Sequence, residues 1–286
     1  GPLEAMPLPH REKRPGLDAL IDVIAPIALD GLVSGDAALA AMPATRRAGS
    51  KPFAIEGQND ATGVWELPQA GQRYPAFQPG RQLANRTGHL NEIEFSEFVM
   101  KAQGFADAVN GSPEFPDMIE EVGRARELDR FASDHDAHLA FTLRARAAAW
   151  SPGFVHQAAG RLGFVPGAIP GRMVLAASET GLPPILGLAF DSQAAFSDDP
   201  DQSAIREIRL SLDVPLVQRA ERPFVRLREA AMALAATMDG VITDDNAQII
   251  RPESLDATGA DLEPLYDTLD AHDLAAGSPQ ARRLFS

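Results

Sequence analysis

The fold is decided by the stretch Ile208-Arg209-Leu210-Ser211-Leu212-Asp213-Val214, in which apolar and polar residues strictly alternate. Successive side chains of a β-strand point to opposite faces, so this pattern predicts a strand with one apolar face and one polar face. The segment His138–Leu143 alternates in the same way and predicts a second strand of this kind. Such strands are typical of antiparallel sheets that bury one face and expose the other.

Helix signals lie between and after these strands. Ser151 followed by Pro152 predicts a helix start, and Pro223 predicts another helix that ends at Gly240. The remaining expected elements of this half are the strands Arg172–Leu175, Ile185–Phe190, Val241–Thr243 and Gln248–Ile250 and a last helix near Gly259–Leu274. The order is β-α-β-β-β-α-β-β-α, which indicates an α+β domain with an antiparallel sheet and helices packed on one face.

The N-terminal half repeats the opening of that order, with a strand at Ile21–Ala28 and a helix capped by Ser34. Its other expected elements are the strands Lys51–Glu56, Arg81–Asn85 and Glu92–Glu97 and the helices Phe98–Val109 and Asp117–Ala132. The final hairpin has no counterpart there, since Ser112–Pro116 leads directly into a charged helix. We therefore predict two related domains in tandem, a degenerate one at 17–133 and a fuller one at 134–275, between flexible segments at 1–16 and 276–286.

Composition excludes several classes of partner and chemistry. The chain has 286 residues, with 40 acidic and 26 basic side chains and a formal net charge of −14. A surface of this kind repels phosphate backbones and anionic headgroups, which argues against nucleic-acid binding and direct membrane adsorption. The absence of cysteine excludes disulfides and thiolate chemistry. No apolar run approaches the roughly 20 residues that cross a bilayer.

One long segment has a distinctive order of features. The stretch 235–252, AATMDGVITDDNAQIIRP, combines a helix end, a glycine stop, an apolar pair, a double-aspartate turn and a closing arginine-proline. The upstream fragments Leu186–Ala189, Leu212–Pro215 and Leu162–Phe164 read as strand and helix ends. In this order and spacing they resemble the FtsZ-binding C-terminal domain family of the bacterial cell-division protein ZipA, over most of residues 137–275. Residues 17–132 resemble that family only in element order and in fragments such as Leu83-Ala84-Asn85.

The resemblance implies a non-catalytic adaptor without a cofactor. Domains of this family leave one sheet face open as a shallow groove, and the C-terminal tail of FtsZ docks there as a short, largely helical peptide. The family tethers FtsZ polymers to the cytoplasmic side of the inner membrane at the division septum, through an N-terminal span and a flexible linker. Gly1-Pro2-Leu3-Glu4-Ala5-Met6 resembles the remnant of a cleaved tag, so we expect such an anchor to precede this sequence.

The resemblance also implies where the peptide binds, namely on the residues that alternate with the core set and on Ile169, which stands where the family has a methionine contact. These partner-binding candidates are His138, Ala140, Thr142, Ile169, Gly187, Ala189, Asp191, Arg209 and Ser211. The family groove has Met, Val and Phe at several of these positions, so the more polar set predicts salt-sensitive binding. The alternative is that the N-terminal domain binds the partner, through a face that includes Phe53, Ile55, Gln82, Ala84, Arg86, Glu94 and Ser96.

Other candidate sites have plainer explanations. The pair His135 and His138 suggests a metal, but a polar domain junction accounts for both, and we expect no metal site. The pair Asp244-Asp245 suggests acid–base chemistry but is typical of a turn. A basic spot formed by Arg46-Arg47 and Lys51 leaves a second function open, a regulatory module that binds a small anionic signalling molecule.

Overall fold

The computed structural model describes residues 16–44, 47–48, 51–199 and 203–286. The chain divides into two compact units between Ser133 and Asp134. We call the part before this division unit 1 and the part after it unit 2. Both units combine helices with antiparallel sheets, so the predicted α+β class is confirmed.

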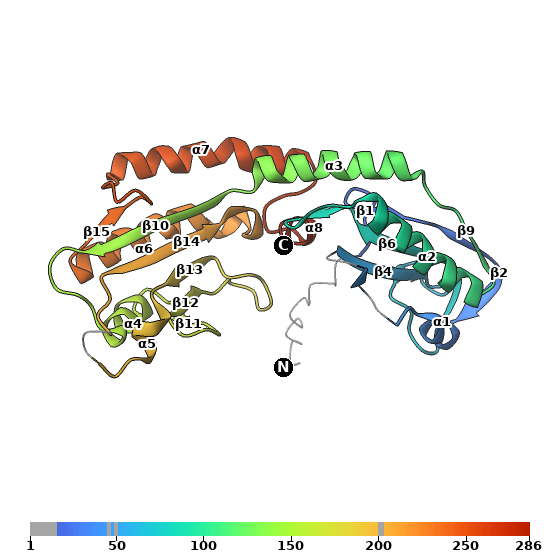
Figure 1. Cartoon of the computed structure of the whole chain (residues 1–286), viewed down its shortest axis with the longest axis horizontal. Helices are drawn as coiled ribbons and strands as arrows, with labels where there is room; N and C mark the ends of the chain where they lie inside the picture. Colours follow the sequence, from blue (N-terminus) through green and yellow to red (C-terminus); the bar gives the residue numbers. More distant parts are fainter. Residues whose placement is uncertain (1–15, 45–46, 49–50, 200–202) are drawn as a thin grey trace, which may run out of the picture. The chain divides into compact units, whose positions relative to one another are not determined.

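Unit 2 contains a six-stranded sheet in the order β11-β12-β13-β14-β10-β15 (Figure 1). Its strands are β10 (His138–Ala145), β11 (Val165–Pro166), β12 (Arg172–Leu175), β13 (Leu186–Ala189), β14 (Glu207–Asp213) and β15 (Gly240–Thr243). Every pair of neighbours is antiparallel. The two alternating stretches therefore form adjacent central strands, β14 and β10.

One face of this sheet forms the core of unit 2. Leu210 lies in register with Phe141 on one side and with Leu188 on the other, and all three side chains are buried. Helix α6 (Pro223–Met238) packs on β10, β14 and β15 and buries residues such as Leu227 against them. The face that carries the apolar residues of the alternating pattern is thus the covered face.

The other helices of unit 2 are α4 (Pro152–Gly160), α5 (Ser192–Phe196), α7 (Pro252–Ala271) and α8 (Pro279–Leu284). The predicted cap of α4 is confirmed, because the Ser151 hydroxyl accepts a hydrogen bond from the Phe154 N–H. Helix α7 begins well before the expected Gly259. The expected strand 248–250 is reduced to a single bridge between Ile249 and Thr243.

The flexible C-terminal segment expected at 276–286 is wrong. Residues 279–284 form α8, and Ala281, Leu284 and Phe285 are each 0% exposed. The Gly277 N–H donates a hydrogen bond of 2.8 Å to the carbonyl of Pro215, which fastens the segment within unit 2. The physical reason is the spacing of the three apolar residues, which places them on one side of a helical turn.

Unit 1 contains a seven-stranded sheet with the path β3-β4-β6-β2-β9, to which β1 and β5 add on β6 and β4. Its strands are β1 (Asp22–Ile24), β2 (Ile27–Ser34), β3 (Arg47–Ala48), β4 (Lys51–Gln58), β5 (Trp65–Glu66), β6 (Arg73–Gln82) and β9 (Gly111–Pro113). A separate two-stranded sheet pairs β7 (Ala84–Asn85) with β8 (Gly88–His89). The helices are α1 (Gly35–Ala41), α2 (Glu92–Ala108) and α3 (Met118–His135).

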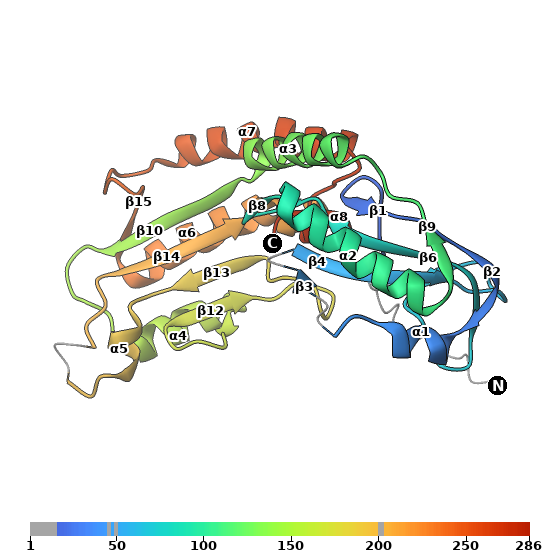
Figure 2. The same ribbon diagram turned by 45° about the vertical axis from the view of Figure 1, so that its right-hand side comes forward.

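An aromatic core lies between α2 and the seven-stranded sheet. In Figure 2 this helix crosses the strands β4 and β6. The ring of Phe53 on β4 lies 6.0 Å from that of Phe98 on α2, and Phe77 on β6 lies 5.1 Å from Phe105. The strand expected at Glu92–Glu97 is wrong, because these residues form the first turns of α2. Asn91 and Glu94 form a capping box that starts the helix there.

Candidate functional site

The candidate site is the face of the unit 2 sheet opposite α6. Ser211 on β14 lies in register with Ala140 on β10 and with Gly187 on β13, so three predicted residues form one row across the strands. A Cβ atom on Gly187 would lie 2.9 Å from the Ser211 hydroxyl, so the glycine makes room for the serine. His138 is exposed and begins β10 on the same face. This row consists of small side chains and offers a close approach to the sheet.

A second row runs through Arg209. This residue lies in register with Thr142 on β10 and Ala189 on β13, and Thr142 also faces Thr243 on β15. Arg172 on β12 continues the row beyond Ala189. The structure therefore brings six of the nine predicted partner-binding residues into two adjacent rows on one face, and His138 lies on the strand that carries two of them.

Two ion pairs lie on this face. The Arg209 Nη1 atom lies 3.2 Å from a carboxylate oxygen of Asp245, and the Arg144 Nη1 atom lies 2.7 Å from a carboxylate oxygen of Glu207. Arg144 also donates a hydrogen bond to the hydroxyl of Thr243. The predicted set did not include Arg144, Glu207 or Asp245. One further step of the alternation, from Thr142 to Arg144 and from Arg209 to Glu207, would have found the first two. Asp245 reaches the face only through the pairing of β15 with β10.

A pocket of about 480 Å³ opens along the middle of the second row. Its volume lies in the range of about 300–1,000 Å³ that is usual for binding pockets. It is lined by Thr142, Ala189, Phe190, Asp191 and the segment Ala204–Arg209. Phe190 and Ile205 provide buried apolar walls, while Arg206 and Arg209 provide exposed positive charge. Asp191 and Glu207 add two negative charges, so the pocket combines apolar walls with a mixed set of charges.

Two predicted site residues are not strand residues. Ile169 lies in the turn between β11 and β12 and is 57% exposed, so the strand phase assumed for it is wrong. Asp191 follows the end of β13 and caps α5 by accepting a hydrogen bond from the Gln193 N–H. Asp191 still lines the pocket, whereas Ile169 does not.

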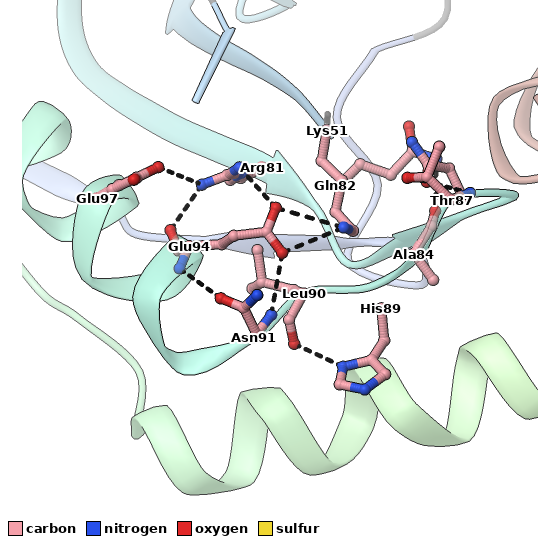
Figure 3. Close-up of polar contacts among 11 residues, drawn as sticks. Lys51, Arg81, Gln82, Ala84, Thr87, His89, Leu90, Asn91, Glu94 and Glu97 are labelled. Carbon is pink, nitrogen blue, oxygen red and sulfur yellow. Dashed lines mark hydrogen bonds and ion pairs between the residues drawn. The ribbon is translucent and has the colours of Figure 1, made fainter. Parts of the chain in front are cut away.

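The residues of the alternative binding face in unit 1 do not form an exposed strand face. Phe53 and Ile55 point into the aromatic core, and Gln82 and Ala84 are buried at 1% and 0% exposure. The Gln82 side chain donates a hydrogen bond to the carbonyl of Ala84. Both residues are labelled in Figure 3. The exposed members of the set do not share a strand face, because Arg86 lies in the turn of the small β7–β8 hairpin and Ser96 lies on α2.

Figure 3 shows a buried cluster of charges beside that hairpin. The carboxylate of Glu94 lies 3.2 Å from the Lys51 ammonium and 3.0 Å from an Arg81 nitrogen, and the two cationic side chains are 3% and 0% exposed. Burial alone would raise the pKa of Glu94, but hydrogen bonds from Arg81 and the Asn91 backbone and the charge of Lys51 outweigh it and lower the pKa. Glu97, whose carboxylate lies 3.8 Å from another Arg81 nitrogen, adds a second negative charge, so two carboxylates face two cations. We interpret the cluster as a structural link between the sheet and α2.

The burial of Lys51 bears on the anion-binding hypothesis. The expected basic spot needed Lys51 together with two arginines, but this ammonium is occupied by Glu94 and is not exposed. Arg46 and the side chain of Arg47 lie outside the described part of the chain. The basic spot therefore lacks one of its three expected members.

A second hollow of about 530 Å³ lies between α6 and α7. Its most prominent charge, Arg219, is already held by carboxylates of α7, with Asp267 at 2.9 Å, Asp270 at 3.4 Å and Glu263 in direct contact. The Arg219 guanidinium also covers the ring of Tyr266, whose pKa burial raises to about 12. This hollow is an ion-paired junction between two helices.

Among the described residues, no group of three or more His, Asp or Glu side chains is placed to hold a metal ion. None of the described helices is long and apolar enough to span a membrane. No family model and no curated protein matches the sequence. The resemblance to FtsZ-binding domains therefore rests on the stretch 235–252 and the fragments upstream of it.

Proposed function

We propose that unit 2 is a peptide-binding module and that its partner is the C-terminal tail of FtsZ. The observation that carries the proposal is the register of β10, β13 and β14, which gathers six predicted residues on the face opposite α6, beside a pocket. No chemical step belongs to this function. The module would serve as a cell-division adaptor at the septum.

The side chains of the face fit a short helix that carries apolar and acidic residues. Ala140, Gly187 and Ala189 are small, so the backbone of a docked helix can come close to the sheet. The pocket accepts an apolar anchor, and anchors that fill pockets dominate the free energy of such interfaces. Arg209 offers a positive charge at 50% side-chain exposure for an acidic residue of the peptide.

The test is a fluorescence-polarisation titration with a peptide of the FtsZ C-terminal tail. Ala189→Trp and Ala140→Glu should abolish binding, because both fill the floor of the face without altering the core. Arg209→Glu should weaken binding, and the loss should shrink as salt rises, since exposed charges are screened within about 10 Å at 0.1 M. We expect micromolar affinity for the unmodified protein, which corresponds to a binding free energy of about −8 kcal/mol.

Matched controls separate the face from general effects. Ala271→Trp adds the same bulk at an exposed position of α7, and Arg86→Glu reverses a charge in unit 1. Both should leave binding unchanged. Circular dichroism must show that each variant is folded. Unchanged binding in folded Ala189→Trp and Ala140→Glu variants would refute the proposed face.

A further inference from the structure

The cation that the proposed peptide would meet is already paired within the chain. Arg209 lies on β14, whereas its partner Asp245 follows β15, and β10 lies between these two strands. The ion pair therefore reaches across β10 above Thr142, which is itself in register with Arg209. Thr142 and Arg209 both line the 480 Å³ pocket, so the ion pair engages one of the cations of the pocket lining.

The turn that presents Asp245 is fastened by its neighbour. The Asp244 carboxylate accepts hydrogen bonds of 2.9 Å from the N–H groups of Asn246 and Gln248. The Asp244 N–H donates to the carbonyl of Gln248, also at 2.9 Å. Asp244 thus explains the double-aspartate turn by itself. Asp245 is 71% exposed, and its contact with Arg209 is not needed to close the turn.

We propose that Asp245 lowers the affinity of the peptide site for acidic partners, by occupying Arg209 as an internal stand-in for an acidic side chain of the partner. This inference rests on the proposed function. A peptide with a suitably placed carboxylate takes over Arg209 and releases Asp245. A peptide without one gains nothing from Arg209, because it can only leave the internal pair intact or break it without compensation. The partner class is therefore a helical segment with an acidic residue next to its apolar anchor.

The other charges on the face do not compete for this role. Glu207 lies 2.7 Å from Arg144, and that arginine also bonds the Thr243 hydroxyl. Asp191 is occupied as the cap of α5. The Arg209–Asp245 pair is exposed at both ends, and exposed pairs contribute little to stability. Asp245 can therefore be displaced, and its removal should raise affinity by only about two- to fivefold.

The test titrates two peptides by fluorescence polarisation. One is the acidic FtsZ tail peptide, and the other has each Asp and Glu replaced by Asn and Gln. Asp245→Asn should tighten binding of the acidic peptide about two- to fivefold and leave the neutral peptide unchanged. The double variant Arg209→Gln with Asp245→Asn should lose that gain. Asp256→Asn is the matched control. Asp256 lies on α7 and pairs with Arg228 of α6, so this change removes the same charge from an ion pair away from the candidate face.

The outcomes separate the two proposals. If the unmodified protein binds the acidic peptide but Asp245→Asn has no more effect than Asp256→Asn, Asp245 is not a competitor and only the present inference is overturned. An equal gain for both peptides would likewise overturn it, because the effect would then not depend on the peptide's carboxylates. If neither peptide binds any variant at millimolar protein, the proposed function fails and the inference fails with it.

Discussion

Replacing Glu94 by glutamine should cost unit 1 about 3–5 kcal/mol of stability at pH 7. The carboxylate is 13% exposed and serves two cationic side chains that are themselves 3% and 0% exposed. Breaking a buried pair is expensive because the remaining charge is left without compensation. Glutamine can still complete a capping box, so the start of α2 is preserved and the loss reports on the charge.

The stability that the Glu94 carboxylate contributes should depend on pH. The pKa of Glu94 is lower in the folded protein than its ordinary value. A lowered folded-state pKa contributes stability that is fully present above the unfolded-state pKa of about 4.3 and is lost as pH falls through the folded-state value. The difference in unfolding free energy between the wild type and Glu94→Gln should therefore be full at pH 7 and should shrink below about pH 4.

Urea unfolding, detected by hydrogen exchange and mass spectrometry, measures the difference in unfolding free energy between the wild type and Glu94→Gln. The exchange of individual peptides shows whether the loss lies in unit 1. Glu97→Gln is the control. The Glu97 side chain is 47% exposed, and its carboxylate lies 3.8 Å from Arg81, which also pairs with Glu94. It should cost less than about 1 kcal/mol. Equal losses in the two variants, or a Glu94→Gln loss that is the same at pH 7 and pH 3, would refute the account of a buried charge cluster.

Three further predictions concern unit 2. Leu210→Ala should cost about 2–5 kcal/mol in urea melts and Ser211→Ala less than about 0.5, because these neighbours lie on opposite faces; similar losses would mean that the faces are misassigned. Phe285→Ala should cost about 3–5 kcal/mol in the same assay, since the side chain is 0% exposed, and a negligible loss would restore the expected flexible tail. Tyr266→Phe should be neutral or stabilising at pH 7, because the buried hydroxyl has no hydrogen-bond partner among the described residues. The pKa of Tyr266 is raised to about 12 in the folded protein, so the wild type should lose stability as pH rises above about 10, where the unfolded tyrosine ionises. Melts at pH 8 and pH 11 should therefore show a smaller loss of stability for Tyr266→Phe than for the wild type.

Local patterns were sufficient where the physics is local. Alternation places Leu210 and Ser211 on opposite faces of a strand whatever the rest of the chain does, and the structure confirms that phase. The same rule failed for Glu92–Glu97, where Ile93 and Phe95 also alternate with polar residues. The spacing of Asn91 and Glu94, a capping-box signal, could have identified this segment as a helix.

Long-range pairing was not accessible from the sequence. The place of Asp245 above β10 depends on β15 pairing with β10, and nothing near residue 245 encodes that choice. The burial of Lys51 likewise depends on a carboxylate from a helix that begins far along the chain. Lys51 was therefore assigned to an exposed basic spot, which was wrong.

The ends of the unit 2 sheet also limit how a partner can be captured. An exposed strand edge is a template on which other chains can pair, and natural proteins protect such edges with short strands and proline. The β11 edge consists of two residues, and one of them, Pro166, has no N–H to donate. At the other edge, the Ile250 N–H bonds the Ile242 carbonyl, so the returning chain occupies part of β15. Unit 2 should therefore resist edge-to-edge aggregation, and a partner has to lie across its strands rather than extend the sheet.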